Sequence, residues 1–400
     1  MRRTLAITVA LAGSLCLFAA PAAADGTLTW ATVNSTTTGD QDNPSVATSR
    51  DGYTAVVWED DRDTTNPTDT AHTEVYLRLY HDGASLFERK VSTGGSGDWR
   101  HIQPDVAVRP GGDTVVVWSD DQDGNGYYQV RVRTFDAAGT LTGTATANAD
   151  ASGQQVNPEV AVDPDGSAFA VVFEDDQTDT APTVRLSGYT SITSKRYERQ
   201  VHANGGTNRH ADVAMGAPGN AIVVWDEDMD GNGYYNVGLA SFTPSGAVKL
   251  AKRLANEATG GQQRNATVAA NFNGDFVAGW VTDHSGTDQV GVRSFTATGA
   301  APAEAFLPGG DPQVGLDDQR HAVAYWHQNG DVYVQGLNPD GTTYDRQPRI
   351  RANETAAGTQ THPALAVDPY GRITMTHSDD ADGDGFEEVV IGTGLTNSTW

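Results

Sequence analysis

The feature that most restricts the fold of this 400-residue chain is a segment that occurs seven times. In the second copy it begins as PDVAV at Pro104, passes through a glycine-containing turn, and continues as VVVW, which ends at Trp118. In the other copies the residues aligned with Trp118 are Trp58, Phe173, Trp225, Trp280, Trp326 and His377. Recurrence at a period of roughly 50 residues predicts a repeat architecture, in which each copy is one unit that buries its apolar face against its neighbours.

Each copy is predicted to form four short β-strands. The first follows the proline, and the second is the valine-rich run that ends in the aromatic residue. The third follows an acidic loop, as in residues 130–135, and the fourth follows a second glycine turn, as at Gly139. Short β-branched runs between turn residues are typical of strands, and no convincing helix pattern follows the N-terminal segment. Four strands per copy and seven copies predict an all-β, seven-bladed β-propeller whose first strands line a central channel.

The ends of the chain indicate how the ring closes. Residues 26–30 (GTLTW), followed by Pro44, match residues 139–142 (GTLT), followed by Pro158. The chain after its leader therefore begins with a fourth strand, whereas the copy that starts at Pro363 has no recognisable fourth strand of its own. We expect a strand at 27–33 to complete the last blade and remove its free edge. The predicted blades begin near residues 42, 101, 156, 209, 263, 311 and 362, within a single domain that spans residues 25–400.

The first 24 residues have the pattern of a secretory signal peptide. Arg2 and Arg3 precede an apolar run from Leu5 to Ala20, and small residues follow up to Ala24. The run is shorter than the ~20 residues that a spanning helix needs. Cys16, the single cysteine, lies inside this segment. We therefore expect a secreted, extracellular protein without disulfides or a transmembrane segment, whose stability comes from a large core or from bound ions.

The net charge of the chain restricts the classes of binding partner that are expected. The chain has 52 acidic and 26 basic residues, and its formal net charge is −26. Nucleic acids and anionic membrane surfaces select for Lys and Arg, so neither is an expected partner. A strongly acidic surface favours cations, of which metal ions are the simplest. We expect a monomer that binds an extracellular glycan or protein.

Three of the acidic loops between second and third strands fit the pattern D-x-[DN]-x-[DN]-G. Oxygen atoms at positions one, three and five of such a loop converge on one point, and glycine at position six permits the sharp turn. The predicted metal ligands are Asp121, Asp123, Asn125, Asp228, Asp230, Asn232, Asp380, Asp382 and Asp384, with Glu388 as a further ligand in the last blade. Oxygen donors favour Ca²⁺ over zinc. The alternative is an ordinary solvated turn, because Asp-Gly-Asn-Gly is also good turn sequence.

A second set of candidate residues directly precedes the proline of each copy, or its equivalent. All seven are polar, and the propeller geometry places them around the mouth of the channel. They are Asn43, Gln103, Asn157, His210, Asn265, Asp311 and His362. They are predicted to form a polar pocket that holds a sugar, a peptide terminus or an ion. The competing interpretation is that they cap the strand starts and bind neighbouring loops. The repeat aromatics such as Trp58 are expected to pack between blades.

Most enzyme signatures are absent. The sequence contains no HExxH, no G-x-S-x-G and no cysteine nucleophile after the leader. The segment from Ser49 to Thr54 only approximates the Asp-box of sialidases. The favoured function is therefore a calcium-stabilised extracellular binding module, with carbohydrate binding as the first expectation. The alternatives are a polysaccharide lyase or glycoside hydrolase that uses the same acidic face, and a structural scaffold associated with the cell envelope.

Two resemblances accompany these interpretations. The repeat VVWSDDQDGNGYYQVRVRTFDAAG, from Val116 to Gly139, resembles the repeat of secreted bacterial seven-bladed propeller proteins of unassigned function. It covers all seven copies and implies the fold and an extracellular setting, but no reaction. The three acidic loops resemble, over about nine residues each, the short calcium loops between propeller strands in integrin-type repeats. A helix-flanked EF-hand is not implied, because its glutamate at position twelve is replaced by Val132, Leu239 and Ile391.

Overall fold

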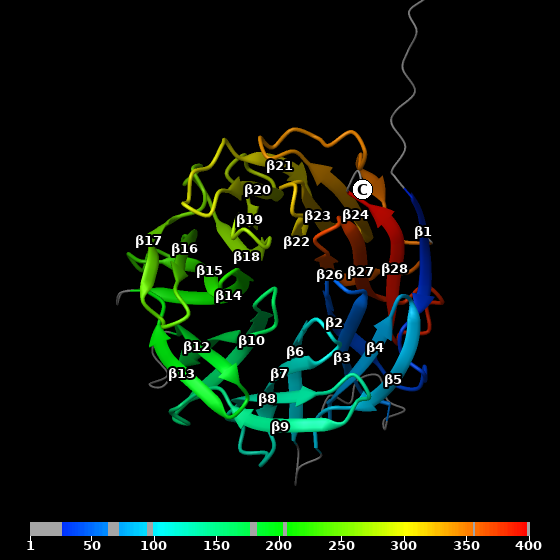
Figure 1. The fold of residues 1–400 in the computed structure, drawn as a ribbon. Helices are drawn as coiled ribbons and strands as arrows, with labels where there is room; N and C mark the ends of the chain where they lie inside the picture. Colours follow the sequence, from blue (N-terminus) through cyan, green and yellow to red (C-terminus); the bar gives the residue numbers. More distant parts are fainter. Residues whose placement is uncertain are drawn as a thin grey trace, which may run out of the picture.

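The computed structural model describes residues 26–62, 72–93, 99–176, 182–202, 206–354 and 357–397. The predicted signal peptide, residues 1–24, lies outside these ranges. The described residues form seven four-stranded antiparallel sheets and no helix, and the sheets are arranged as blades around a central opening (Figure 1). This confirms the predicted seven-bladed β-propeller. The described part of the chain has no helix with the length and apolarity needed to cross a membrane.

Each blade places its first strand at the channel and its last strand at the rim of the ring. Blade 1 contains β2 (Gln41–Thr48), β3 (Tyr53–Asp60), β4 (Glu74–His81) and β5 (Ala84–Lys90). Blade 2 contains β6 (Arg100–Val108), β7 (Thr114–Asp121), β8 (Gln129–Phe135) and β9 (Leu141–Thr146). Blade 3 contains β10 (Gln154–Val162), β11 (Phe169–Asp176), β12 (Thr183–Ser191) and β13 (Ser194–Gln200). Blade 4 contains β14 (Thr207–Gly216), β15 (Asn220–Asp228), β16 (Asn236–Phe242) and β17 (Val248–Leu254).

The remaining blades follow the same order. Blade 5 contains β18 (Gln263–Ala270), β19 (Phe276–Thr282), β20 (Gln289–Phe295) and β21 (Ala305–Pro308). Blade 6 contains β22 (Gly310–Leu316), β23 (Ala322–Gln328), β24 (Asp331–Leu337) and β25 (Ile350–Arg351). Blade 7 contains β26 (Gln360–Val367), β27 (Arg372–Asp379), β28 (Glu388–Thr396) and, from the other end of the chain, β1 (Gly26–Thr32).

The ring closes through its N-terminal strand, as the sequence predicts. Strand β1 pairs antiparallel with β28, with Ala31 opposite Ile391, and the pairing continues where the Val33 N–H donates to the carbonyl of Val389 at 2.7 Å. The two strands lie side by side in Figure 1 although they come from opposite ends of the sequence. The Trp30 indole also donates to the carbonyl of Ala352 in blade 6, at 2.7 Å. The first strand therefore joins the last blade and also contacts the blade before it.

Hydrophobic packing lies in the seams between blades. The described residues form seven apolar clusters, and each is shared by two consecutive blades. In the seam between blades 3 and 4, Trp225 packs with Leu186 on one side and Phe242 on the other, and all three side chains are fully buried. The repeat aromatics are buried in this way because both faces of each sheet are covered by neighbouring blades. They are packing residues, as predicted.

A buried amide pair fixes four of the seven connections between blades. Between blades 2 and 3, the Asn148 side-chain oxygen accepts from the Val130 N–H at 3.0 Å, and its amide nitrogen donates to Gln155 at 3.3 Å. Gln155 in turn donates to the Asp175 carboxylate at 3.2 Å. The same pairing recurs in Asn34–Gln41, Asn256–Gln263 and Asn353–Gln360. Satisfied buried polar groups hold a backbone in one arrangement, so these pairs set where each inner strand begins at the channel mouth.

Candidate functional site

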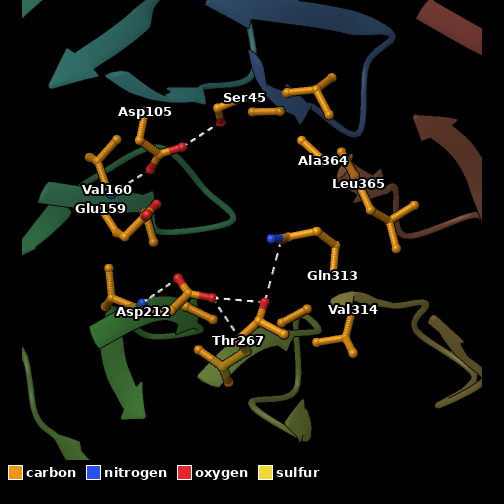
Figure 2. Close-up of a pocket in the computed structure, with 18 of the residues that line it drawn as sticks. Ser45, Asp105, Glu159, Val160, Asp212, Thr267, Gln313, Val314, Ala364 and Leu365 are labelled. Atoms are coloured by element: carbon orange, nitrogen blue, oxygen red, sulfur yellow. Dashed lines mark hydrogen bonds between the residues drawn. The ribbon is translucent and has the colours of Figure 1, made fainter. Parts of the chain in front are cut away.

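The central channel, whose mouth is ringed by the predicted polar residues, is a cavity of about 760 Å³. It is lined by the innermost strands of all seven blades, and Figure 2 shows side chains from several of them pointing into the opening. No Lys or Arg is among the described residues that line it. The cavity is within the range of small-molecule and oligosaccharide pockets, and such pockets usually combine apolar walls with a few placed polar groups.

The seven predicted ring residues share one unusual backbone conformation. Each has a positive φ, between 45° and 56°, and each lies where the pairing of the first and second strands skips a residue. They are Asn43, Gln103, Asn157, His210, Asn265, Asp311 and His362. An extra residue of this kind is a β-bulge, which bends the strand and redirects its side chains. Asn, Asp and His tolerate the left-handed region better than most residues do, which accounts for six of the seven.

The ring side chains link consecutive blades. In blade 3, the Asn157 side-chain nitrogen donates to Glu174 Oε1 at 2.6 Å, and the same oxygen accepts from the backbone N–H of His210 in blade 4 at 2.8 Å. The pattern recurs in blade 1, where Asn43 donates to Glu59 at 3.0 Å and Glu59 also accepts from the Gln103 N–H at 2.8 Å. These bonds tie the ring residues to the neighbouring blades. A ligand would meet a ring that is already positioned.

The two ring histidines differ in their electrostatic setting. His210 Nδ1 lies 2.8 Å from Asp226, and this hydrogen bond raises the pKa of His210 above its ordinary value, against the opposing effect of burial. Burial lowers the pKa of His362, although Asp311 and Asp40 act in the opposite direction. Their side chains are 40% and 50% exposed, so both imidazoles are accessible from the channel mouth.

We expect these two histidines to titrate on opposite sides of pH 6.5. In a two-dimensional NMR titration, the His210 resonance should have its midpoint above 6.5 and the His362 resonance below it. Asp226→Asn should lower the His210 midpoint and leave the His362 midpoint unchanged. Because the folded pKa of His210 is raised, its contribution to stability is present at low pH and is lost as the pH rises through that pKa. Equal midpoints for the two residues would contradict the arrangement.

A second tier of side chains lies two residues after each ring residue, and its members were not among the predicted site residues. Its members are Ser45, Asp105, Glu159, Asp212, Thr267, Gln313 and Ala364 (Figure 2). Asp105 accepts from the Ser45 hydroxyl at 2.5 Å and from the Val160 N–H at 2.7 Å. Asp212 accepts from the Val268 N–H at 2.7 Å. Blades 2, 3 and 4 therefore place three carboxyl groups next to one another on one side of the channel, and these form the carboxyl wall (Asp105, Glu159 and Asp212).

The carboxyl wall has little compensation from positive charge. Burial raises the pKa of Asp212 to about 7 and also raises the pKa of Asp105. Burial and the neighbouring charges of Asp105 and Asp212 raise the pKa of Glu159 well above its usual range. The raised pKa values favour protonated carboxyls in the wall, and a protonated carboxyl can donate as well as accept hydrogen bonds. Figure 2 shows Val314 and Leu365 on the other side of the opening, where the lining is apolar.

The predicted calcium loops of blades 2 and 4 have nearly identical geometry. The Asp121 carboxylate accepts from the N–H groups of Asn125 and Gly126, both at 3.0 Å, and Asn125 Oδ1 accepts from the Tyr127 N–H at 2.7 Å. The blade 4 loop repeats each bond at Asp228 and Asn232, with distances of 2.7–3.1 Å. Asp123 and Asp230 are held by hydrogen bonds from the Asn125 and Asn232 side chains at 2.9 and 2.8 Å.

The blade 7 loop gathers three aspartates at one point. Carboxylate oxygens of Asp380, Asp382 and Asp384 all lie within 4.8 Å of one another. Burial, together with the charges of Asp382 and Asp384, raises the pKa of the adjacent Glu388 to about 7. An oxygen-only donor set with this excess of negative charge fits the ligand preference of Ca²⁺. Asp63 and Asp179, which belong to neighbouring acidic loops, lie outside the described residues.

Comparisons with known proteins establish the fold. No model of a known protein family and no curated protein matches the sequence. A protein of unknown function from Dyadobacter fermentans DSM 18053 is similar in structure, with a TM-score of 0.55 and 13% identity over 92% of this chain and 98% of that one. Virginiamycin B lyase from Staphylococcus aureus has a TM-score of 0.54 and 10% identity over 92% and 99% of the two chains. The Hadza microbial sialidase Hz136 has a TM-score of 0.52 and 12% identity, over 90% of this chain and 66% of that one.

Proposed function

We propose that the protein is a secreted, calcium-stabilised binding module that holds the end of a glycan chain in its channel mouth. The observation that carries the proposal is the two-sided cavity, in which the carboxyl wall faces an apolar side below a ring of polar residues. Sugar hydroxyls pair with groups that both donate and accept hydrogen bonds, and the C–H faces of a sugar ring pack on apolar surfaces. The leader segment supports the extracellular setting.

The structural neighbours do not select the ligand. They include a lyase, a sialidase and a protein of unknown function, all at 10–13% identity. Similarity at this level concerns the fold, and one fold carries many unrelated activities. The proposal therefore depends on the side chains of this channel.

Calcium should raise the melting temperature more than sodium does at equal ionic strength. A ligand that binds only the folded state stabilises it by about 2.7 kcal/mol at one hundred times its Kd. Asp382→Ala should reduce this shift, because it removes one of the three clustered carboxylates. Asp165→Ala is the matched control, since it removes an exposed carboxylate from a turn at the other end of the blades. Identical melting curves in calcium and in EDTA would eliminate calcium from the proposal.

A glycoside hydrolase is the second candidate, and one observation favours it. Such enzymes commonly need one protonated and one ionised carboxyl near the scissile bond. The carboxyl wall favours a protonated carboxyl for the acid role, since burial raises the pKa of Asp212 to about 7 and that of Glu159 well above its usual range. Against it, Asp105 and Asp212 also accept backbone hydrogen bonds from the next blade, which is a structural role.

One set of assays separates these functions. The protein is screened on a glycan array in calcium and in EDTA, and each glycan that binds is then tested for release of reducing ends. Binding without turnover supports the module, turnover supports the hydrolase, and neither on any glycan overturns both. Glu159→Ala should weaken binding at least tenfold without unfolding the protein, because blade 7 already has alanine at this position (Ala364). Asp165→Ala should bind as the parent does.

A further inference from the structure

The seams between blades are closed at their outer edge by a repeated contact. In blades 2, 4 and 5 the turn between the third and fourth strands contains Gly139, Gly246 or Gly299. A side chain from the fourth strand of the preceding blade lies directly against each glycine. These side chains are Phe87, Tyr197 and Leu250, and they come within 3.0, 2.7 and 3.1 Å of the positions that Cβ atoms on the three glycines would occupy. These three residues occupy equivalent positions in their blades, because each pairs with the equivalent residue of the third strand. The pairs are Phe87–Leu79, Tyr197–Gly188 and Leu250–Ser241.

The seam between blades 2 and 3 is closed from the opposite side. In this seam the fourth-strand position is Gly143, which pairs with Thr134 in the same register. Ile192, in the turn of blade 3, fills the space that a Cβ on Gly143 would take. A small residue on one side of the seam is thus matched by a large residue on the other. Between blades 5 and 6, the small side chain of Ala305 in the fourth strand of blade 5 lies 3.3 Å from the position that a Cβ atom on Gly341 would occupy, and Ala305 pairs with Val292 in a different register.

Among the six seams whose turn the structure describes, the one between blades 7 and 1 is different. The fourth-strand residue in this register is Thr29, which pairs with Thr393 and is exposed. The turn of blade 1 contains Gly83, and no atom lies within 4 Å of its Cβ position. Neither side supplies the large residue that closes the seams between blades 1 and 2, 2 and 3, 3 and 4, and 4 and 5, and no atom approaches Gly83 as Ala305 approaches Gly341. The space that remains is a cavity of about 450 Å³, which we call the seam pocket.

The seam pocket has apolar walls and a polar edge. Its lining includes Tyr80 and Ile391, whose side chains pack in the seam between blades 7 and 1. It also includes Trp30, Tyr53 and Leu395, whose side chains pack in the two neighbouring seams. Ile391 and Leu395 are buried, and the ring of Tyr53 is stacked on His81 at a centroid distance of 4.1 Å.

The edge of the seam pocket contains opposite charges. Asp82 lies in the blade 1 turn with 70% of its side chain exposed, and Arg372 contacts Asp368 at 2.5 Å. These turns are at the far end of the blades from the ring residues. The seam pocket is therefore separate from the channel mouth.

We propose that the seam pocket is a second binding site, for a small ligand that presents an aromatic ring. The sister seams fill the corresponding space with Phe, Tyr or Leu, so the walls at this position suit a ring of that size. In the bound state the ring lies over Gly83 as Phe87 lies over Gly139, and Asp82 and Arg372 meet its polar substituents. The volume is within the range of small-ligand sites, and mixed apolar and polar linings are typical of them. This site does not depend on the proposed glycan function.

The test uses p-cresol and toluene, which reproduce the Tyr and Phe side chains of the sister seams. Isothermal titration calorimetry of the folded protein should show binding of p-cresol at one site. Thr29→Phe should weaken this binding at least tenfold and raise the melting temperature, because it supplies the residue that the seam lacks. If Thr29→Phe does not fold, Thr29→Leu, which copies Leu250, is used instead. Cyclohexanol, which is similar in size but not aromatic, should bind at least tenfold more weakly than p-cresol.

A reciprocal variant tests the internal comparison. Leu250→Thr should open an equivalent pocket between blades 4 and 5, and p-cresol should then bind at two sites. Leu250 is only partly buried, so the variant should remain folded. The proposal is overturned if the parent protein binds neither compound at millimolar concentration, if Thr29→Phe binds p-cresol as the parent does, or if cyclohexanol binds equally well.

Discussion

Deletion of residues 26–34 should lower the melting temperature by roughly 10 °C or more and cause the protein to aggregate. The deletion removes β1, and with it the burial of Leu28, Trp30 and Val33 in the seams of blades 6, 7 and 1. Each such side chain contributes about 1.5–3 kcal/mol when it is fully buried. The deletion also exposes the free edge of β28, and unpaired edges are sites of strand addition between molecules.

A synthetic peptide of residues 26–36, added in trans, should restore part of the lost stability. The measurement is thermal unfolding followed by circular dichroism, with light scattering to detect aggregation. A peptide in which Trp30 is replaced by Ala should be less effective, since it cannot donate to the carbonyl of Ala352 or fill the seam. A deletion variant that unfolds cooperatively at the parent temperature would show that β1 is dispensable for ring closure.

Acid should destabilise the protein through His377, which occupies the position of the repeat aromatic in blade 7. Burial lowers the pKa of His377 to about 3. Below its ordinary pKa of about 6.5, the unfolded state takes up a proton that the folded state does not, so stability falls by about 1.36 kcal/mol per pH unit. The loss begins near pH 6.5 and continues towards pH 3. At pH 4.5 it amounts to about 2.7 kcal/mol.

The variant that isolates this effect is His377→Phe combined with Tyr325→Phe. The second change is needed because the Tyr325 hydroxyl lies 2.8 Å from His377 Nδ1, and a buried hydroxyl left without a partner is costly. Phe173 occupies the same repeat position in blade 3, so the fold accommodates the ring. Urea unfolding at pH 7.0 and 4.5 gives the decrease in the free energy of unfolding between the two pH values. This decrease should be smaller in the variant by about 2.7 kcal/mol. Carboxyl groups titrate in both proteins and cancel in the comparison. If the free energy of unfolding decreases by the same amount in both proteins, groups other than His377 cause the destabilisation by acid.

The fold was predictable because the repeat appears directly in the sequence. A run of alternating residues after a proline, a valine-rich run and a buried aromatic recur seven times, and the match between residues 26–30 and 139–142 indicates how the ring closes. Each of these signals is local, so it can be recognised in the sequence without knowledge of tertiary contacts. The same is true of the three acidic loops, whose ligand pattern lies within six consecutive residues.

The candidate site was predictable only in part. The ring positions were identified from their place before the proline, but their left-handed conformation was not, because Gln103 adopts it although Gln is not among the residue types that favour it. The carboxyl wall had a visible signal, since Asp105, Glu159 and Asp212 all lie two residues beyond the ring and alternation places them on the same face. The seam pocket has no local signal. It depends on the sizes of Thr29 and Gly83, which are far apart in the sequence and meet only after the ring closes.

The compensation between Gly143 and Ile192 has a consequence for how the chain can be rearranged. Blades 2 and 3 differ from the others at a matched pair of positions, and the two differences fit only each other. If a copy of blade 4 replaced blade 3, Gly143 would lose its contact with Ile192. A cavity would then open in the seam between blade 2 and the inserted blade. The unit that keeps this packing intact is therefore the boundary between blades 2 and 3. Duplication, loss or grafting of repeats should succeed when the chain is joined within a sheet, because the two halves of each seam between blades then stay together.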